Sequence, residues 1–311
     1  MARKTPIATE QRNPRTRGFD RKSTIDLLRT IHREDARVPE AVAGALPKIA
    51  RAVDAIAQAL RQGGRLFYVG AGTSGRLAAL DAAELPPTFG TPARMVQAVI
   101  AGGRRALTHA VEGAEDNRAQ GIRDLAAARL THKDVVVGIT ASGSTPYVQG
   151  ALEFARRRRA ITIGITSNPR TPVTQIANIS IITPTGPEVI AGSTRMKAGT
   201  AQKMVLNMLS TASMIRIGRV HDNWMIGVAL TNRKLQARGL RILLEASGAT
   251  VAEATRALRQ SGYAMDVALI MLKTGANARD ARQCLRATTG NLREALARLK
   301  QTSRNRQRYH G

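Results

Sequence analysis

Cysteine is nearly missing from this sequence, since Cys284 is the only one among 311 residues. A single thiol cannot close a disulfide within the chain, and it excludes a zinc site built from several cysteines. No apolar run approaches the roughly 18 residues that a membrane-spanning helix needs. Residues 1–18 also lack the apolar stretch of a secretory signal. We therefore expect a cytoplasmic protein without membrane partners.

Aromatic residues are scarce as well, at 3% of the chain. This scarcity argues against the stacking surfaces that bind single-stranded nucleic acid. Acidic residues are outnumbered, with 22 Asp and Glu against 48 Lys and Arg and a net charge of +26. Because the basic excess is spread along the chain, an arginine-rich soluble surface explains it better than a dedicated nucleic-acid surface. Nucleic acid is therefore not expected as a partner.

The ends of the chain differ from its middle. Residues 1–44 are expected to form a polar arm followed by a helix that starts at Ser23 or Thr24, with a second helix running from Pro39 to about Leu60. Glycines punctuate a set of short helices after residue 220, which predicts a small C-terminal helical bundle over 221–303. Residues 304–311 are expected to be a frayed basic tail.

The middle of the chain alternates short Val- and Ile-rich runs with helical stretches. Continuous apolar runs of this kind are typical of parallel strands that are buried on both faces. They predict an α/β fold with a doubly wound, flavodoxin-like, five-stranded parallel sheet over residues 45–220. The five predicted strands are residues 65–70, 94–100, 134–140, 161–166 and 179–183.

Two loops that each follow a strand and precede a helix are rich in glycine and hydroxyl groups. Residues 70–76 (GAGTSGR) include Thr73 and Ser74, and residues 140–146 (TASGSTP) make the stronger phosphate cradle. Hydroxyls and backbone amides at a helix N-terminus bind anions, and the carboxyl ends of parallel strands share one crevice. The sequence therefore predicts a site for a phosphorylated polyol, whose phosphate contacts are Ser142, Gly143, Ser144 and Thr145.

Two glutamates are the candidate acid–base pair. Glu84 shares a helical stripe with Leu77 and Leu80, so we expect it to point inward at the end of its helix. Such surroundings favour an acid that keeps its proton. A straight helix from Gly75 would put Glu84 about 15 Å from the first loop, so the phosphate is assigned to residues 140–145. Glu115 is the second candidate, although its position alone favours a solvated turn residue. A second subunit is a candidate to complete the site.

A fourth segment, residues 186–203 (GPEVIAGSTRMKAGTAQK), follows the last predicted strand and opens a long helix. Ser193 is a plausible helix cap, and Lys197 is suited to meet an anion. Glu188 lies in the same segment. We expect these three residues to lie near the substrate.

The segment 186–203 resembles the signature of the glucokinase-regulatory-protein and N-acetylmuramic acid 6-phosphate etherase family. The resemblance extends to residues 9–14 (TEQRNP), 69–76, 81–90, 110–116, 142–147 and 202–211. It covers almost the whole chain. A single sugar isomerase (SIS) domain in about 300 residues is similar to the bacterial etherases and not to the much longer regulatory protein.

The resemblance implies cleavage of the D-lactyl ether of N-acetylmuramic acid 6-phosphate during cell-wall sugar recycling. The products are N-acetylglucosamine 6-phosphate and D-lactate. It implies Glu84 and Glu115 as the catalytic pair, with Glu84 as proton donor and Glu115 as base or the reverse. Thr73 and Ser74 would contact the sugar, and a homodimer is expected. The chemistry needs two carboxyl groups and neither metal nor other cofactor.

Three other functions remain open at this point. A sensor that binds sugar phosphates without catalysis would need the same loops but not two carboxylates. An aldose–ketose isomerase would share the fold and the carboxylate base. A nucleic-acid-binding regulator would need a helix-turn-helix ahead of the domain, for which residues 1–44 are short.

Overall fold

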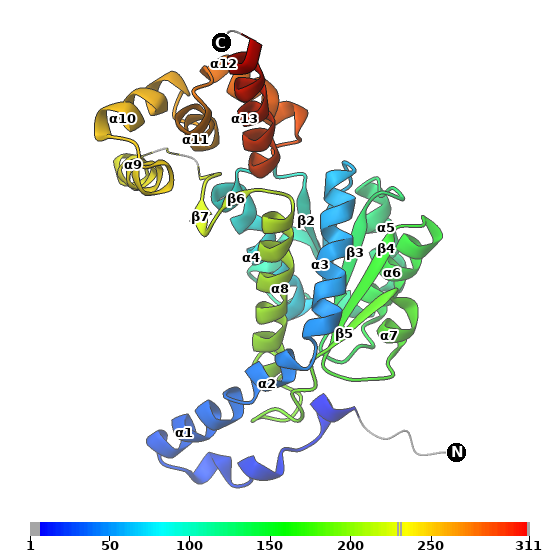
Figure 1. Ribbon diagram of the computed structural model, residues 1–311. Coiled ribbons are helices and arrows are strands. Elements are labelled where there is room, and N and C mark those ends of the chain that lie inside the picture. Colours follow the sequence, from blue (N-terminus) through cyan, green and yellow to red (C-terminus); the bar gives the residue numbers. More distant parts are fainter. Residues whose placement is uncertain (1–6, 229, 231, 310–311) are drawn as a thin grey trace. The chain divides into compact units, whose positions relative to one another are not determined.

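The computed structural model describes residues 7–228, 230 and 232–309, with side chains up to residue 302 (Figure 1). The chain divides into two compact units. The first contains the residues up to Ala83 and Arg94–Thr211, and the second contains Glu84–Ala93 and the residues from Ala212 onward. The predicted domain limits at residues 45, 220 and 303 differ from this division and stay a prediction.

The first unit is built on the predicted five-stranded parallel sheet, in the order β2-β1-β3-β4-β5. Leu66 of β1 pairs with Val96 of β2 on one side and with Val135 of β3 on the other. All residues of β1 and β3 are buried, because helices cover both faces of the sheet. The strands are β1 (Leu66–Gly70), β2 (Val96–Ile100), β3 (Val135–Ile139), β4 (Ile161–Thr166) and β5 (Ile179–Ile182).

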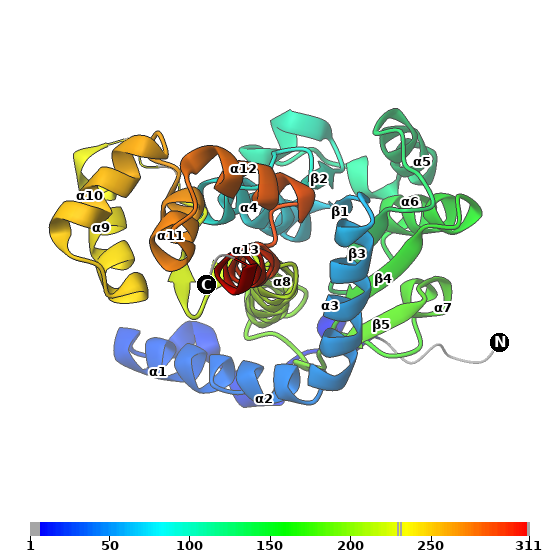
Figure 2. The same ribbon diagram turned by 45° about the horizontal axis from the view of Figure 1, so that its top comes forward.

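Six helices of the first unit cover the two faces of this sheet, three on each side (Figures 1 and 2). Phe67 and Val69 face one side, where they pack with residues of α5 (Arg118–Ala127), α6 (Pro146–Arg157) and α7 (Pro172–Ile176). Tyr68 points to the other side, which is covered by α3 (Leu46–Arg61), α4 (Gly72–Phe89) and α8 (Lys197–Arg216). The alternating faces of the strands thus separate two helical layers.

The N-terminal part of the first unit contains more structure than the sequence predicted. Short 3-10 turns at Ala8–Glu10, Pro14–Thr16 and Phe19–Arg21 precede α1 (Thr24–Asp35) and α2 (Val38–Ala43). Ser23 caps α1, as predicted, because its hydroxyl accepts a hydrogen bond from Asp26 N. Of the four apolar residues that predicted this helix, Ile25 and Leu28 are exposed by 52% and 57%, while Leu27 and Ile31 are half-buried. Its buried residues are polar instead, namely Thr30 and Glu34.

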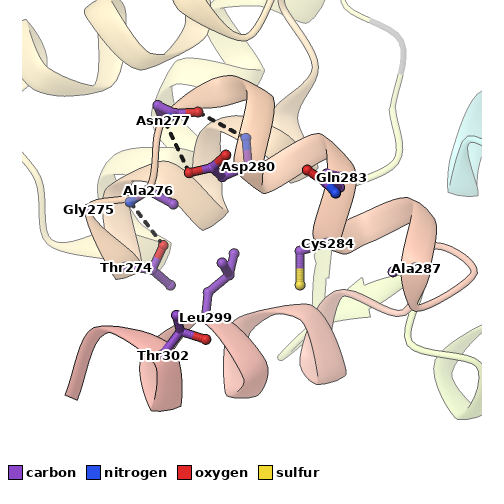
Figure 3. A pocket seen from close by; sticks show the side chains of 10 residues that line it. All are labelled: Thr274, Gly275, Ala276, Asn277, Asp280, Gln283, Cys284, Ala287, Leu299 and Thr302. Carbon is purple, nitrogen blue, oxygen red and sulfur yellow. Dashed lines mark hydrogen bonds between the residues drawn. The ribbon is translucent and has the colours of Figure 1, made fainter. Parts of the chain in front are cut away.

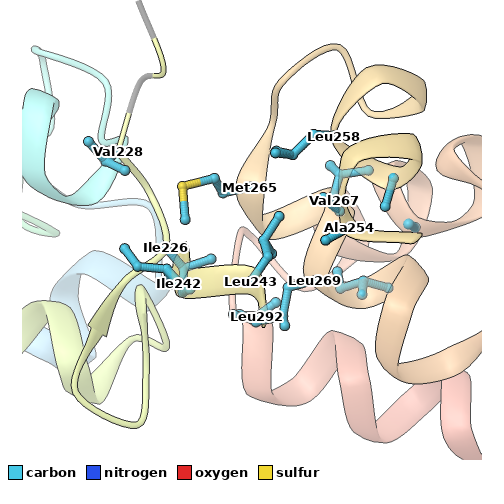
Figure 4. Packing of buried hydrophobic residues seen from close by; sticks show 14 of the residues in the cluster. Ile226, Val228, Ile242, Leu243, Ala254, Leu258, Met265, Val267, Leu269 and Leu292 are labelled. Atoms are coloured by element: carbon cyan, nitrogen blue, oxygen red, sulfur yellow. The ribbon is translucent and has the colours of Figure 1, made fainter. Parts of the chain in front are cut away.

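The second unit consists of a short hairpin and a helical bundle around its own apolar core (Figure 4). Its elements are β6 (Val220–His221), β7 (Trp224–Met225), α9 (Arg233–Ser247), α10 (Val251–Gln260), α11 (Met265–Thr274), α12 (Ala278–Ala287) and α13 (Leu292–Tyr309). The predicted C-terminal bundle is therefore confirmed. Gly248 and Gly275 end two of these helices with positive φ angles of 72° and 70°, as terminal glycines do.

Most of the predicted basic tail belongs to the last helix of the chain. Helix α13 extends to Tyr309, so the prediction of a frayed end from residue 304 is wrong for the backbone up to 309. Residues 310 and 311 lie outside the described part of the chain. Over the residues that are described, no helix is both long and apolar enough to span a bilayer.

Candidate active site

The hydroxyl-rich loop of residues 140–145 connects β3 to α6 and gathers four side-chain oxygens. The Thr140 and Thr145 hydroxyls lie 2.7 Å apart, and Ser144 Oγ donates to Ser142 Oγ over 3.0 Å. Pro146 occupies the first turn of α6, where no amide hydrogen is needed. The structure thus brings the four predicted phosphate contacts together at a helix N-terminus, which is an arrangement that favours anions.

Gly143 gives this loop its shape. Its φ angle of +77° lies in the left-handed region, and its carbonyl accepts a hydrogen bond from Val173 N over 3.1 Å. A Cβ atom at this position would come within 2.3 Å of Thr171 Oγ1, which belongs to the capping box of α7. The loop therefore lies against α7 in a way that only glycine permits.

We expect Gly143→Ala to destabilise the protein by more than the roughly 1–2 kcal/mol that a left-handed non-glycine residue costs. The added methyl group must also displace Thr171. Gly63→Ala is the matched control, because Gly63 has a φ of +80° with no atom within 4 Å of its Cβ position. Thermal unfolding of both variants measures the difference, and equal losses would contradict the close packing of this loop.

The first glycine-rich loop is tighter than the sequence suggested, because α4 already begins at Gly72. A Cβ on Gly75 would lie 2.5 Å from Ile100 Cγ1, so this glycine allows α4 to approach β2. Ser74 is buried and donates to Gln202 Oε1 of α8 over 2.9 Å. Thr73 is half-buried. Ser74 is thus engaged within the protein, and its predicted contact with the sugar stays a prediction.

Glu115 lines a hollow of about 160 Å³ beside this loop. It lies on a 3-10 turn, Ala114–Asp116, that packs against α6, the helix that follows the hydroxyl-rich loop. Arg76 holds the neighbouring loop in place by donating to the carbonyls of Ala106 and His109, each over 2.9 Å. The lining includes Ala71, Gly72, Arg76, Val111, Gly113 and Glu115. Glu115 and the glycine-rich loop are therefore neighbours.

The predicted orientation of Glu84 is wrong. Its side chain is exposed, and α4 continues past it to Phe89 through Pro86 and Pro87. The buried stripe of α4 is shifted by one residue from the predicted stripe of Leu77, Leu80 and Glu84. Its members are Ala78, Asp81, Leu85 and Phe89, all below 9% exposure. In the part of the chain that the structure describes, Glu84 is thus neither buried nor at the end of its helix.

Asp81 is the carboxylate that α4 does bury. Tyr68 donates to its Oδ2 over 3.1 Å and Ser210 to its Oδ1 over 3.2 Å. Burial raises the pKa of Asp81, and these two hydrogen bonds oppose the rise. The cluster joins β1, α4 and α8, which supports a structural role for Asp81.

Glu188 and Lys197 are both fully buried, and each is paired with protein groups. The two Glu188 carboxylate oxygens accept hydrogen bonds from Lys197 N and Ala198 N over 3.0 and 2.9 Å, which caps α8. The Lys197 ammonium donates to Glu34 Oε2 over 2.6 Å. Ser193 is half-buried in the same segment. The proposed substrate contacts of these three residues stay predictions.

The sequence reasoning missed the partners of Lys197. Glu34 also accepts hydrogen bonds from Asn13 Nδ2 over 2.9 Å and from Arg15. The Arg15 hydrogen bond is the largest of the effects that lower the pKa of Glu34 to about 2. No sequence signal marked Glu34, because a glutamate is rarely fully buried and nothing in its local sequence indicates a partner.

A larger hollow in the second unit, about 450 Å³, is bounded by α12, α13 and the loop before α12 (Figure 3). Its polar groups form hydrogen bonds with one another. Asn277 and Asp280 exchange hydrogen bonds, and Ala276 N donates to Thr274 Oγ1. Within the described residues, no three His, Cys, Asp or Glu side chains lie close enough together to hold a metal ion. The hydroxyl-rich loop and the hollow beside Glu115 both belong to the first unit.

Comparison with known proteins shows which families this chain resembles. Residues 48–156 match the family of the glucokinase regulatory protein N-terminal SIS domain, and residues 114–212 match the SIS domain family. Proteins named N-acetylmuramic acid 6-phosphate etherase from Yersinia pestis (strain Pestoides F) and Yersinia pseudotuberculosis serotype O:1b (strain IP 31758) are 53% identical over 279 residues. The matches cover 90% of this chain and 95% of each relative.

Solved structures give more distant matches. A phosphoheptose isomerase from Francisella tularensis is 19% identical, with a TM-score of 0.48 over 62% of this chain and 98% of that one. A phosphoheptose isomerase from Neisseria gonorrhoeae is 18% identical, with a TM-score of 0.48 over 61% of this chain and 98% of that one.

Proposed function

The chain belongs to the N-acetylmuramic acid 6-phosphate etherase family, and we propose that it is the lyase that cleaves the D-lactyl ether of that sugar phosphate. One observation of the site carries the proposal. Glu115 opens into a hollow beside the glycine-rich loop, and its turn packs against α6, which the hydroxyl-rich loop precedes. A carboxylate base and an anion-binding loop are two of the parts that the reaction requires, and a second carboxyl group is the third. We further propose that the enzyme acts in the cytoplasm.

The proposed chemistry is an elimination followed by a hydration. In the open-chain aldehyde form of the substrate, the proton on carbon 2 is acidic because it is adjacent to the carbonyl group. A carboxylate removes this proton, the C3–O bond breaks, and the lactate oxygen leaves with a proton from a second carboxyl group. Water then adds to carbon 3 of the unsaturated aldehyde, which gives N-acetylglucosamine 6-phosphate and D-lactate.

Each of the candidate residues has one role in the proposed reaction. Glu115 acts as the base, and Glu84 donates a proton to the lactate oxygen. The loop of residues 140–145 holds the phosphate through its hydroxyls and the amides at the start of α6. Because all of these groups are protein side chains or backbone amides, the proposal assigns no step to a cofactor.

The direct test is D-lactate release from N-acetylmuramic acid 6-phosphate by the purified full-length protein. We expect stoichiometric release of D-lactate and N-acetylglucosamine 6-phosphate, measured by an enzymatic lactate assay and by mass spectrometry. N-Acetylmuramic acid without the phosphate is the control substrate, and it should react much more slowly. Binding of the phosphorylated sugar without lactate release would favour the sensor instead.

We also propose that the protein is a homodimer whose partner covers the exposed face of α4. Leu80 is 47% exposed and lies one helical turn before Glu84, so the two side chains share a face. Ile25 and Leu28 on α1 add further exposed apolar surface. A covering subunit would remove these side chains from water and would supply the enclosed surroundings that Glu84 lacks in one chain.

Leu80→Glu should shift the protein from dimer to monomer, because it puts a charge into the proposed interface. We expect at least a tenfold weaker dimer in sedimentation velocity, together with loss of lactate release. Val251→Glu is the control, since Val251 is 59% exposed on the bundle of the second unit. A Leu80→Glu protein with the mass of the wild type would refute the proposed interface.

A further inference from the structure

The segment of residues 7–16 has few apolar side chains, yet two of its polar ones are almost completely buried. Thr9 has no exposed surface and Asn13 retains 2%. Gly192 N donates to Thr9 O over 3.2 Å, and Asn13 Nδ2 donates to Pro187 O over 3.2 Å. The segment is thus attached by polar contacts to the loop that leads into α8.

Asn168, which follows β4, connects this segment to the hydroxyl-rich loop. Its Oδ1 accepts a hydrogen bond from Ala8 N over 2.9 Å. Its Nδ2 donates to Thr9 Oγ1 over 3.2 Å and to the Ala141 carbonyl over 2.9 Å. A backbone amide can only donate and a carbonyl can only accept, so these partners fix which way the side-chain amide faces.

The Ala141 carbonyl accepts two further hydrogen bonds, from Thr166 Oγ1 over 3.1 Å and from Ser167 N over 3.0 Å. In a trans peptide the carbonyl and the next N–H point in opposite directions. Holding the Ala141 oxygen against residues 166–168 therefore turns the Ser142 N–H away from them. The orientation of this first peptide sets the direction of the loop that follows.

We propose that Asn168 is a positioning residue, which uses the buried Ala8–Thr9 segment to hold the phosphate-binding loop of residues 140–145 in its binding geometry. This inference rests on the proposed function, because it assumes that the loop holds the phosphate of the substrate. Asn168 itself touches protein groups on every side. Asn168 affects the placement of the loop, and it acts on the substrate only through the loop.

The test uses Asn168→Ala, with Asn178→Ala as the matched control. Asn178 joins β4 to β5, accepting from Thr162 N and Thr162 Oγ1 over 2.9 and 2.8 Å, but it does so at the end of β4 that lies opposite to Thr166 and Asn168. Calorimetry with N-acetylglucosamine 6-phosphate as the probe should show at least tenfold weaker binding for Asn168→Ala. Asn178→Ala should bind within about twofold of wild type.

Thr9→Val gives a second, milder variant in case Asn168→Ala does not fold. It keeps the shape of the buried side chain and removes the acceptor for Asn168 Nδ2. We expect a three- to tenfold rise in KM for the substrate, with kcat within about twofold of wild type. A purely structural role would not separate these two constants in this way.

The outcomes are distinct for the two proposals. If the wild type binds no sugar phosphate, both proposals fall. If the wild type binds the probe and the folded Asn168→Ala and Thr9→Val proteins bind it equally well, the positioning role falls and the proposed function stands. If Asn178→Ala weakens binding as much as Asn168→Ala does, the effect is general destabilisation and the positioning role also falls.

Discussion

Replacing Glu115 with glutamine should lower kcat for lactate release by about 10²- to 10⁴-fold, the usual contribution of a general base. Glutamine keeps the size of the side chain but cannot take a proton from carbon 2. Because Glu115 is exposed at the rim of the hollow, the variant should fold like the wild type. Lactate release and exchange of the carbon-2 proton with solvent deuterium should both fall.

Glu112→Gln provides the control, since Glu112 lines the same hollow three residues earlier on the same loop. It should retain wild-type kcat within about threefold. Glu84→Gln tests the other half of the pair. It should keep the carbon-2 exchange but slow the departure of lactate. Loss of exchange in Glu84→Gln and its retention in Glu115→Gln would show that the two roles are reversed.

Replacing Glu34 with glutamine should cost about 3–5 kcal/mol at pH 7, because it leaves the fully buried Lys197 ammonium without its partner. Such a loss lowers the midpoint of thermal unfolding on the order of 10 °C in a protein of this size. Circular dichroism at pH 7 measures the change. A midpoint within 2 °C of the wild type would contradict the importance of this ion pair.

The same carboxylate should make stability depend on pH. Its pKa is about 2 in the folded protein against the ordinary 4.5, because Arg15, Lys197 and Asn13 all stabilise the charged form. A lowered pKa stabilises the fold at pH values above 4.5, and that contribution disappears as the pH falls from 4.5 toward 2. The loss amounts to about 3 kcal/mol. Urea unfolding across this range should show the slope in the wild type and a smaller one in Glu34→Gln.

Lys197→Met distinguishes a buried charge from a general loss of packing. Alone it should destabilise the protein, since it removes a partner from the Glu34 carboxylate. Combined with Glu34→Gln it should recover stability relative to Glu34→Gln alone, because no charge is then left unpaired in the interior. Additive losses in the double variant would mean that the two residues do not act as a pair.

The sheet could be predicted because its signal is local. The Val- and Ile-rich runs mark each strand by composition, and the strand β3 (Val135–Ile139) is apolar over its whole length apart from one glycine. The hydroxyl-rich loop followed from its position after that strand. Its four predicted contacts do lie together, because the loop and the helix after it are fixed by neighbouring residues.

The orientation of Glu84 could not be predicted with the same security. The stripes containing Leu80 and Leu85 are equally regular, and they differ by a rotation of about 100° about the helix axis. Two prolines after Glu84 suggested a helix end, yet α4 continues to Phe89. A proline inside a helix removes one hydrogen bond and crowds the carbonyl four residues before it, so it ordinarily kinks or ends a helix, but α4 continues through both.

The partners of Glu34 were beyond prediction for another reason. Lys197 lies 163 positions away and Asn13 lies 21 positions away, so no local pattern links them. In addition, α1 buries Thr30 and Glu34 while Ile25 and Leu28 face outward. Hydrophobicity alone therefore does not single out Thr30 and Glu34 as the buried residues of this helix.

The separation of Glu34 and Lys197 in the sequence has a consequence for folding during synthesis on the ribosome. At roughly 5–20 residues per second, Lys197 is added on the order of ten to thirty seconds after Glu34. Asn168 likewise follows Thr9 by 159 positions. The polar groups of Thr9 and Glu34 therefore remain hydrated until most of the sheet has been synthesised. The N-terminal segment therefore closes onto residues 168–197 only after residue 197 has been synthesised.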